Sequence, residues 1–381
     1  MKKMLGVMVS FFVMALVLSG CSSTSDTIKL GLNFELSGEV ASYGQAEVQG
    51  IELAIEQVNA AGGINGKQIE LVKRDNKSDA AEATSIATYL ATQEKVSVIL
   101  GAATSGLTKA QVPVANQYEV PLISPSATAD DVTNDGVIVE PFIYRVSFID
   151  SFQGITMANF AVENLGKSKA VILGDQSSDY AKGLAETFTA QFTDNGGTVV
   201  AQEAYVSGDQ DFNSVLTLIG QMDFDVLFVP GYYQEVGLII KQARESGITT
   251  PILGGDGFDS PVLFELAGND ALVDIYFSQA YSSLDEDPMV TKFISDFSDK
   301  YGVEPNAFSA LGYDSAMLAV DAIKRAGSED PKLVNEALQS TVNFAGVTGS
   351  ITVDEWHNAV KSAVVLEIQN GEVVGSMRVN P

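Results

Sequence analysis

Short apolar runs and longer amphipathic stretches alternate along the first third of this chain. The apolar runs predict strands over residues 27–34, 68–74, 96–100 and 120–124. The amphipathic stretches between them predict helices over 45–60, 80–93 and 107–118. Strands that alternate with helices in this way form a parallel sheet with helices on both faces. We therefore expect an α/β unit in this part of the chain.

The same alternation restarts after Phe142. It predicts helices at 152–164, 180–193, 212–221 and 235–246, and strands at 170–174, 198–205, 226–229, 251–253 and 275–279. Three further helices follow at 288–301, 306–325 and 331–339, and the last strands are expected at 350–353, 363–368 and 373–379, with turns at 354–361 and Asn370-Gly371. The chain therefore predicts two doubly wound parallel-sheet lobes of similar size.

The N-terminus has the features of an export signal. Lys2 and Lys3 precede an uncharged run from Met4 to Gly20, and small residues stand directly before Cys21. A membrane span is the alternative, but this run is at the short limit for a span. We expect a lipoprotein signal peptide at 1–20, lipid attachment at Cys21 and a polar tether at 21–26, which predicts an extracytoplasmic, lipid-anchored protein.

Charge and residue usage restrict the possible functions. The chain has 22 Lys and Arg against 49 Asp and Glu, a formal charge of −27, so nucleic acid is a poor partner. Cys21 is the only cysteine, which excludes an internal disulfide. The only histidine, His357, stands beside Trp356 in a polar turn and is expected at the surface. Because a nucleophile usually needs a histidine base and zinc usually needs His or Cys, we expect no catalytic residue, no metal and no cofactor.

Polar residues at predicted strand ends suggest a binding site instead. Ser105 and Thr128 follow adjacent strands, where hydroxyls and helix N-terminal amides could hold a carboxylate. Asp256 could hold an ammonium group, and four aromatic residues could enclose an apolar slot: Tyr43, Tyr180, Tyr232 and Phe308. Each residue alone also fits a structural role in a turn or a core. Together they describe a zwitterion with a hydrophobic side chain.

Several motifs support that interpretation, and they are spread over the chain from Thr27 onward. They read NAAGGING at 59–66, GAATSG at 101–106, LISPSAT at 122–128, DSFQG at 150–154, DYAKG at 179–183, GYYQEVG at 231–237 and GGDG at 254–257, together with Ser37-Gly38 and Tyr43-Gly44. In these motifs and their order the chain resembles the leucine/isoleucine/valine-binding proteins of ABC importers, which have the type I periplasmic-binding-protein fold.

The resemblance implies a role for each candidate residue. Ser105 and Thr128 would bind the ligand carboxylate with main-chain groups of Ala103 and Ser126, and Asp256 would hold the ammonium group. Tyr232 would help to orient the ammonium group, and the remaining pocket walls would be Tyr43, Tyr180 and Phe308. Branched-chain binders resemble a pattern with Glu at the position of Asp256, so a ligand here would sit deeper or be larger. A cysteine pair that some members carry near Ser78 and Thr104 is absent.

The resemblance also implies the organisation and the partners. Lobe 1 would be 27–146 plus 281–361 and lobe 2 would be 147–280 plus 362–381, joined by a hinge of three crossovers. The partners would be an amino acid ligand and an ABC permease with its ATPase, and the protein would be a monomer on the outer face of the membrane of a Gram-positive cell. Two alternatives stay open, namely a sensor of the same fold that feeds a signalling receptor and a binder of another amino acid or amide.

Overall fold

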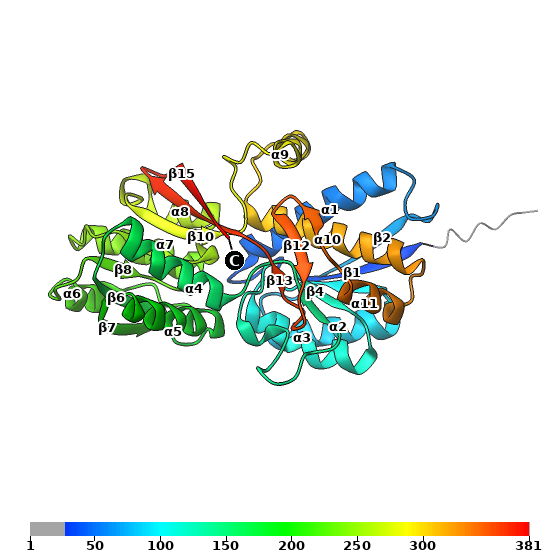
Figure 1. Cartoon of the computed structure of the whole chain (residues 1–381), viewed down its shortest axis with the longest axis horizontal. Helices are drawn as coiled ribbons and strands as arrows, with labels where there is room; N and C mark the ends of the chain where they lie inside the picture. The colour runs from blue at the N-terminus through cyan, green and yellow to red at the C-terminus, as the bar shows by residue number, and fades with distance from the viewer. Residues whose placement is uncertain (1–26, 381) are drawn as a thin grey trace, which may run out of the picture.

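The computed structural model describes residues 27–380. The signal peptide expected at 1–20, the lipid site at Cys21 and the tether at 21–26 lie outside the described residues. Within 27–380, no helix is long and apolar enough to cross a membrane. Figure 1 shows two α/β lobes side by side, with the blue, cyan and orange elements on the right and the green elements on the left.

The right-hand lobe is built on a five-stranded parallel sheet. Its order is β2 (Ile69–Asp75), β1 (Ile28–Phe34), β3 (Val98–Leu100), β4 (Leu122–Ser124) and β5 (Ile143–Arg145). Residues of β3, β4 and β5 are buried throughout because helices cover both faces of a parallel sheet. The strand β5 was not predicted.

The left-hand lobe has a seven-stranded sheet that is parallel except at one edge. Its order is β15 (Glu372–Val379), β14 (Ala363–Gln369), β10 (Ile275–Gln279), β9 (Ile252–Gly254), β8 (Val226–Phe228), β6 (Lys169–Asp175) and β7 (Thr198–Tyr205). The strand β14 runs antiparallel to β10, and β15 runs antiparallel to β14. The predicted α/β class with parallel sheets is confirmed, and the antiparallel edge arises because a tight turn joins β14 to β15.

A small third sheet occupies a region predicted to contain one strand and a turn. It consists of β11 (Phe344–Gly346), β12 (Gly349–Val353) and β13 (Ala359–Val360), all antiparallel. The turn expected over 354–361 is therefore partly wrong, because residues 359–360 pair with β12.

Helices cover both sheets close to where the sequence predicted them. They are α1 (Ala41–Ala60), α2 (Ala80–Tyr89), α3 (Ser105–Tyr118), α4 (Asp150–Asn159), α5 (Asp179–Asp194), α6 (Asn213–Ile219), α7 (Tyr233–Glu245), α8 (Pro261–Ala267), α9 (Pro288–Tyr301), α10 (Ala307–Ala326) and α11 (Pro331–Gln339). Short π-helical turns extend α2 and α4 over Leu90–Glu94 and Phe160–Asn164, and 3-10 turns occur at Asp130–Val132, Asp256–Phe258 and Asn269–Ala271. The helix α8 was not predicted, and α3 begins two residues earlier than expected, at Ser105.

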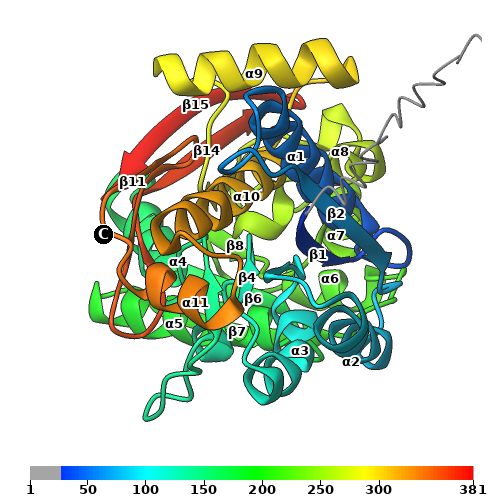
Figure 2. The same ribbon diagram turned by 90° about the vertical axis from the view of Figure 1, so that its right-hand side faces the viewer.

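After β10 the chain returns to the first sheet. Helices α10 and α11 share an apolar core with β1, β3 and α1, while α9 packs on α1 and α10 and lies at the top of the molecule in Figure 2. The sheets change at the positions where the lobes were expected to change, with β10 ending at Gln279 and β14 beginning at Ala363. The residue boundaries of the lobes stay a prediction.

Two glycines bring α1 and α10 unusually close together. A Cβ atom at Gly50 would lie 1.9 Å from the carbonyl oxygen of Ser309, and one at Gly312 would lie 2.2 Å from that of Glu47. Only hydrogen atoms fit at these two crossing points. The close approach fixes the two helices that carry Tyr43 and Phe308.

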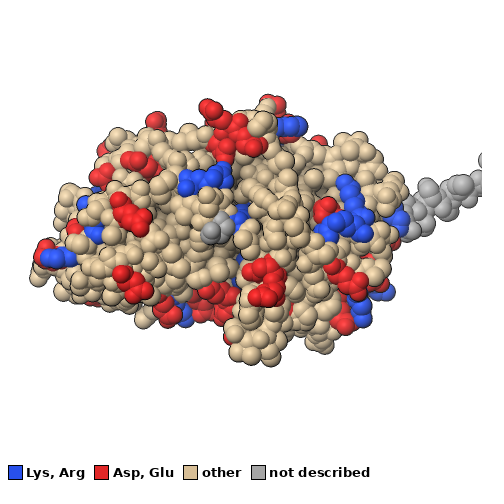
Figure 3. All heavy atoms as spheres, in the orientation of Figure 1, with Lys and Arg blue, Asp and Glu red and all other residues tan. Residues whose placement is uncertain are grey.

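The acidity found in the composition is spread over the surface. On the face in Figure 3, acidic side chains are scattered over both lobes, and basic side chains form only small groups. This face therefore offers no broad basic surface.

Candidate functional site

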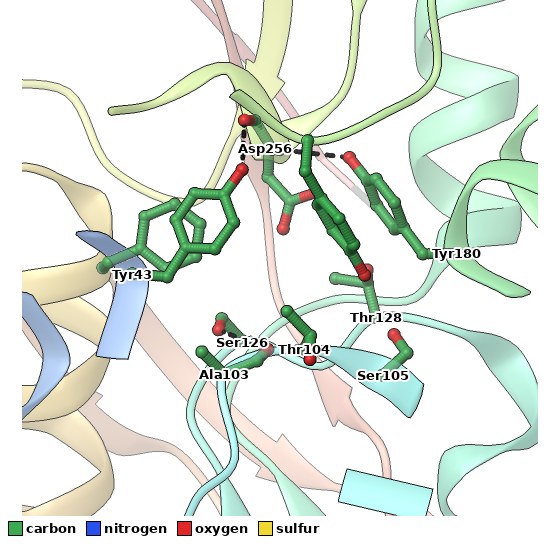
Figure 4. A pocket seen from close by; sticks show the side chains of 11 residues that line it. Tyr43, Ala103, Thr104, Ser105, Ser126, Thr128, Tyr180 and Asp256 are labelled. Atoms are coloured by element: carbon green, nitrogen blue, oxygen red, sulfur yellow. Dashed lines mark hydrogen bonds between the residues drawn. The ribbon is translucent and has the colours of Figure 1, made fainter. Parts of the chain in front are cut away.

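All nine candidate binding residues line one small pocket between the two lobes. The space between their atoms, counted up to the open solvent, is about 230 Å³. Eleven residues line it (Figure 4), and they are Tyr43, Ala103, Thr104, Ser105, Ser126, Thr128, Tyr180, Tyr232, Asp256, Gly257 and Phe308. Thr104 and Gly257 are additions to the predicted set. The structure thus brings together residues that are more than 260 positions apart in the sequence.

Glu35 shapes the turn between β3 and α3. Its buried carboxyl accepts hydrogen bonds from the amides of Ala103 and Thr104, both at 3.1 Å, and from the Thr104 hydroxyl at 3.0 Å. Burial raises the pKa of Glu35, although these hydrogen bonds oppose the rise. The carbonyl of Ala103 accepts a hydrogen bond from Ser126, so both main-chain groups of Ala103 already have protein partners.

Ser105 and Thr128 provide the free donors on this side of the pocket. The Ser105 hydroxyl accepts a hydrogen bond from the Ala129 amide at 3.1 Å and keeps its own proton to donate. Within residues 27–380 the amides of Ser105 and Thr128 have no acceptor. Ser105 is the first residue of α3, where the helix dipole favours an anion. These donors can hold a carboxylate.

Glu47 lies behind Ser126 and was not predicted to belong to the site. It is fully buried in α1 and contacts the Ser126 hydroxyl, which also lies 2.9 Å from the Ala103 carbonyl oxygen. A hydroxyl has one proton and can donate to only one of these groups. Burial raises the pKa of Glu47 well above its ordinary value, although the hydrogen bond with Ser126 opposes the rise.

Asp256 faces these groups from the other lobe. It begins the 3-10 turn after β9 and is 4% exposed, and in Figure 4 its carboxyl projects between the rings of Tyr43 and Tyr180. Its Oδ1 atom accepts a hydrogen bond from Gln153 at 3.1 Å. Burial raises the pKa of Asp256 to about 6. In the part of the chain that the structure describes, no Lys or Arg pairs with it.

Aromatic rings enclose the space between the two poles. Tyr43 and Phe308 stack with centroids 4.3 Å apart, and Tyr180 and Tyr232 stack at 5.1 Å. Tyr43 meets Tyr232 edge to face at 5.8 Å and donates a hydrogen bond across the lobes to the Gly257 carbonyl. The pocket therefore has hydrogen-bond donors at one end, a carboxyl at the other and aromatic walls between them.

The predicted surface position of His357 is wrong. His357 is only 7% exposed, its ring stacks on Tyr144 at 4.4 Å, and its Nδ1 atom lies 3.1 Å from the carbonyl oxygens of Glu140 and Ile143. The turn that carries it folds back on the first lobe, which the polar sequence around it does not reveal. His357 lines none of the pocket described above.

Sequence reasoning missed the buried supports of the pocket, Glu35, Glu47 and Gln153. The signal for the two acids was present, because Glu35 directly follows an apolar strand and Glu47 stands among apolar residues of α1. An acidic residue in such a position is unusual unless it has a partner. Gln153 was part of the quoted DSFQG motif but had no role assigned to it.

Comparisons with known proteins agree with this architecture. A family model described as periplasmic binding protein matches residues 27–372. In Streptococcus pneumoniae, the branched-chain amino acid transporter substrate binding protein LivJ, solved in complex with isoleucine, is similar in structure. It has a TM-score of 0.89 and 44% identity, over 93% of this chain and 100% of that one.

Two further relatives are similar over most of their length. The leucine binding protein LivK of Thermotoga maritima has a TM-score of 0.87 and 37% identity, with 93% of this chain and 99% of that chain covered. The leucine-, isoleucine-, valine-, threonine- and alanine-binding protein of Pseudomonas aeruginosa is 29% identical over 344 residues, which is 90% of each chain. The family model spans nearly all described residues, and the similar structures share the two-lobed fold. The chain therefore belongs to the periplasmic binding proteins, a family that binds solutes and does not catalyse reactions.

Proposed function

We propose that this protein is the substrate-binding component of an ABC importer and binds leucine, isoleucine or valine in the pocket between its lobes. One observation carries the proposal. Asp256 is a buried carboxyl without a cationic protein partner, and it faces free amides and hydroxyls across an aromatic slot. A buried charge needs a partner, so the pocket is suited to a ligand that brings an ammonium group.

The two ends of the pocket match the two ends of an amino acid. The carboxylate would accept hydrogen bonds from the amides and hydroxyls of Ser105 and Thr128. The ammonium group would donate to Asp256, with Tyr232 beside it. Charge-assisted hydrogen bonds at both ends would fix the orientation, and desolvation of an aliphatic side chain against the rings would add roughly 25 cal/mol per Å² of apolar surface.

The similar proteins support the solute class. The one from Streptococcus pneumoniae, 44% identical to this chain, is named for branched-chain amino acids and was solved in complex with isoleucine. The one from Thermotoga maritima is named for leucine. The side chain of Asp256 is shorter than that of Glu, so the depth of the pocket would decide which branched-chain amino acid binds best.

The cellular setting follows from the sequence. Lipid on Cys21 would hold the monomer on the outer face of the cell membrane of a Gram-positive cell, where the closed form would deliver its ligand to the permease. Closure would move lobe 1 (27–146 plus 281–361) against lobe 2 (147–280 plus 362–381) about the three crossovers. Hinge closure of this kind is a general feature of such proteins.

Calorimetric titration of ligand-stripped protein with a panel of amino acids tests the proposal. We expect saturable binding of leucine, isoleucine or valine and weaker binding of polar amino acids. If another solute gives heat of binding and the three branched-chain amino acids give none, the ligand assignment is refuted. Co-purification with a signalling receptor instead of a permease would favour the sensor function.

A further inference from the structure

Gln153 has a fully buried amide that is bonded at both ends. It lies in the first turn of α4, directly after the first crossover between the lobes, and has 0% exposure. Its Oε1 atom accepts hydrogen bonds from the Asp256 amide at 3.0 Å and from the Ser278 hydroxyl at 2.8 Å. Its Nε2 atom donates to Oδ1 of Asp256 at 3.1 Å and to Oδ1 of Asp150 at 3.3 Å.

These four contacts allow only one orientation of the amide. Rotating it by half a turn would place its carbonyl oxygen against two carboxyls and its NH₂ group against an amide donor. The side chain therefore holds both the backbone and the carboxyl of Asp256 from behind. Ser278, at the end of β10 next to the second crossover, holds Gln153 in turn.

Asp150 explains why such a support is needed. Its Oδ2 atom is buried and has no hydrogen-bond partner, and burial raises the pKa of Asp150 well above its ordinary value. It shares the Gln153 amide with Asp256. The Thr128 hydroxyl also favours a charged Asp150, and the Tyr180 hydroxyl favours a charged Asp256, but the Gln153 amide donates to both carboxyls. Without this bridging NH₂ group the two carboxyls would share no donor, and either could turn away from its present position.

We propose that Gln153 is a positioning residue for recognition of the ligand's ammonium group, because it aims the Asp256 carboxyl into the pocket and separates it from Asp150. This inference rests on the proposed function, in which Asp256 receives the ammonium group. Gln153 does not line the pocket itself and acts only through Asp256.

Other titratable groups also face Asp256, and none of them is a cation. They come from α1, α4, α5 and the turn before α7, and they are Tyr43, Glu47, Asp150, Tyr180 and Tyr232. The two acids among them disfavour a charged Asp256. The side chains that favour the charged form are the Tyr180 hydroxyl and the Gln153 amide.

The test uses Gln153→Met, which keeps the length of the side chain and removes the amide. The affinity for L-isoleucine is measured by calorimetry from about pH 5 to pH 8. We expect it to fall by about tenfold or more, as for the loss of a hydrogen bond to a charged group. We also expect the pH at which binding is half lost to move upward, because a carboxyl without its donor is protonated at higher pH.

Gln111→Met is the matched control. Gln111 is equally buried and also bonds through both ends of its amide, to Asn33 and to the Leu107 carbonyl, but it does not touch Asp256. Its replacement should lower the melting temperature and leave the pH dependence of binding unchanged. If Gln153→Met does not fold, Ser278→Ala removes one hydroxyl from the same network, and we expect about threefold weaker binding with a pH shift in the same direction.

The outcomes separate this inference from the proposed function. If the unaltered protein binds none of the three branched-chain amino acids, the proposed function is wrong and this inference falls with it. If the unaltered protein binds L-isoleucine but the pH dependence of binding does not move in Gln153→Met or in Ser278→Ala, only the role of Gln153 is overturned.

Discussion

Replacing Asp256 by Asn should weaken ligand binding and stabilise the ligand-free protein. The side chain keeps its size and loses its charge. Binding should fall about 10- to 150-fold, since a hydrogen bond to a charged group contributes roughly 1.5–3 kcal/mol. A gain in stability is expected because the charge is buried without a cation.

The size of the stability change follows from the pKa of Asp256. Burial raises this pKa from 3.8 to about 6, so the folded state holds the proton more tightly than the unfolded state. The destabilisation is therefore absent below the unfolded pKa, develops between the two values and is complete above about pH 6, where it reaches ~3 kcal/mol. Asp256→Asn should gain up to that amount near neutral pH and almost nothing at about pH 4.

Urea unfolding of ligand-free protein at both pH values measures this change, and Asp314→Asn is the control. Asp314 is equally buried, but it accepts hydrogen bonds from the amides of Val347 and Thr348 and lies near Lys361. Burial also raises the pKa of Asp314, but its replacement would leave the buried Lys361 ammonium without a carboxylate, so it should lower the free energy of unfolding and leave affinity unchanged. A loss of stability in Asp256→Asn near neutral pH, or an affinity within about threefold of the unaltered protein, would refute the reasoning.

Three further predictions concern the pocket and the packing of the lobes. Affinity for an amino acid should fall as the pH drops through about 6, because Asp256 becomes protonated; an affinity that stays constant down to about pH 5 would contradict this. Lys109→Met removes the ion pairs that join α3 to Asp179 of α5, at 2.9 Å, and to Asp131. Small-angle scattering of the ligand-free protein should then show a larger fraction of molecules with the lobes apart. The affinity for ligand should fall at most about fivefold, and the fall should be smaller at high salt. Gly50→Ala should cost about 1–3 kcal/mol in urea unfolding because its Cβ would lie 1.9 Å from the Ser309 carbonyl oxygen. Gly106→Ala, in α3 with open space around the added Cβ, should show no such loss.

Much of the site could be predicted from the sequence because the fold places strand ends together. GAATSG and SPSAT follow β3 and β4, which are neighbours in a parallel sheet, so Ser105 and Thr128 had to lie at the same edge. The residues behind the pocket could not be found in this way. The role of Gln153 depends on its hydrogen bonds with Asp256 and Ser278, which are more than 100 positions away in the sequence.

The local pattern of the sequence determined the strand and helix alternation, the α/β class and the chemical character of the two ends of the pocket, because burial repeats with a period that neighbouring residues display. The tertiary structure alone decided which lobe each segment joins, as with α10 and its return to the first sheet, and which buried groups pair, as with Glu35 on the Ala103 amide. It also decided the burial of His357. Periodicity reports that a residue is covered, whereas the partner that covers it comes from a distant part of the chain and depends on how the whole chain packs.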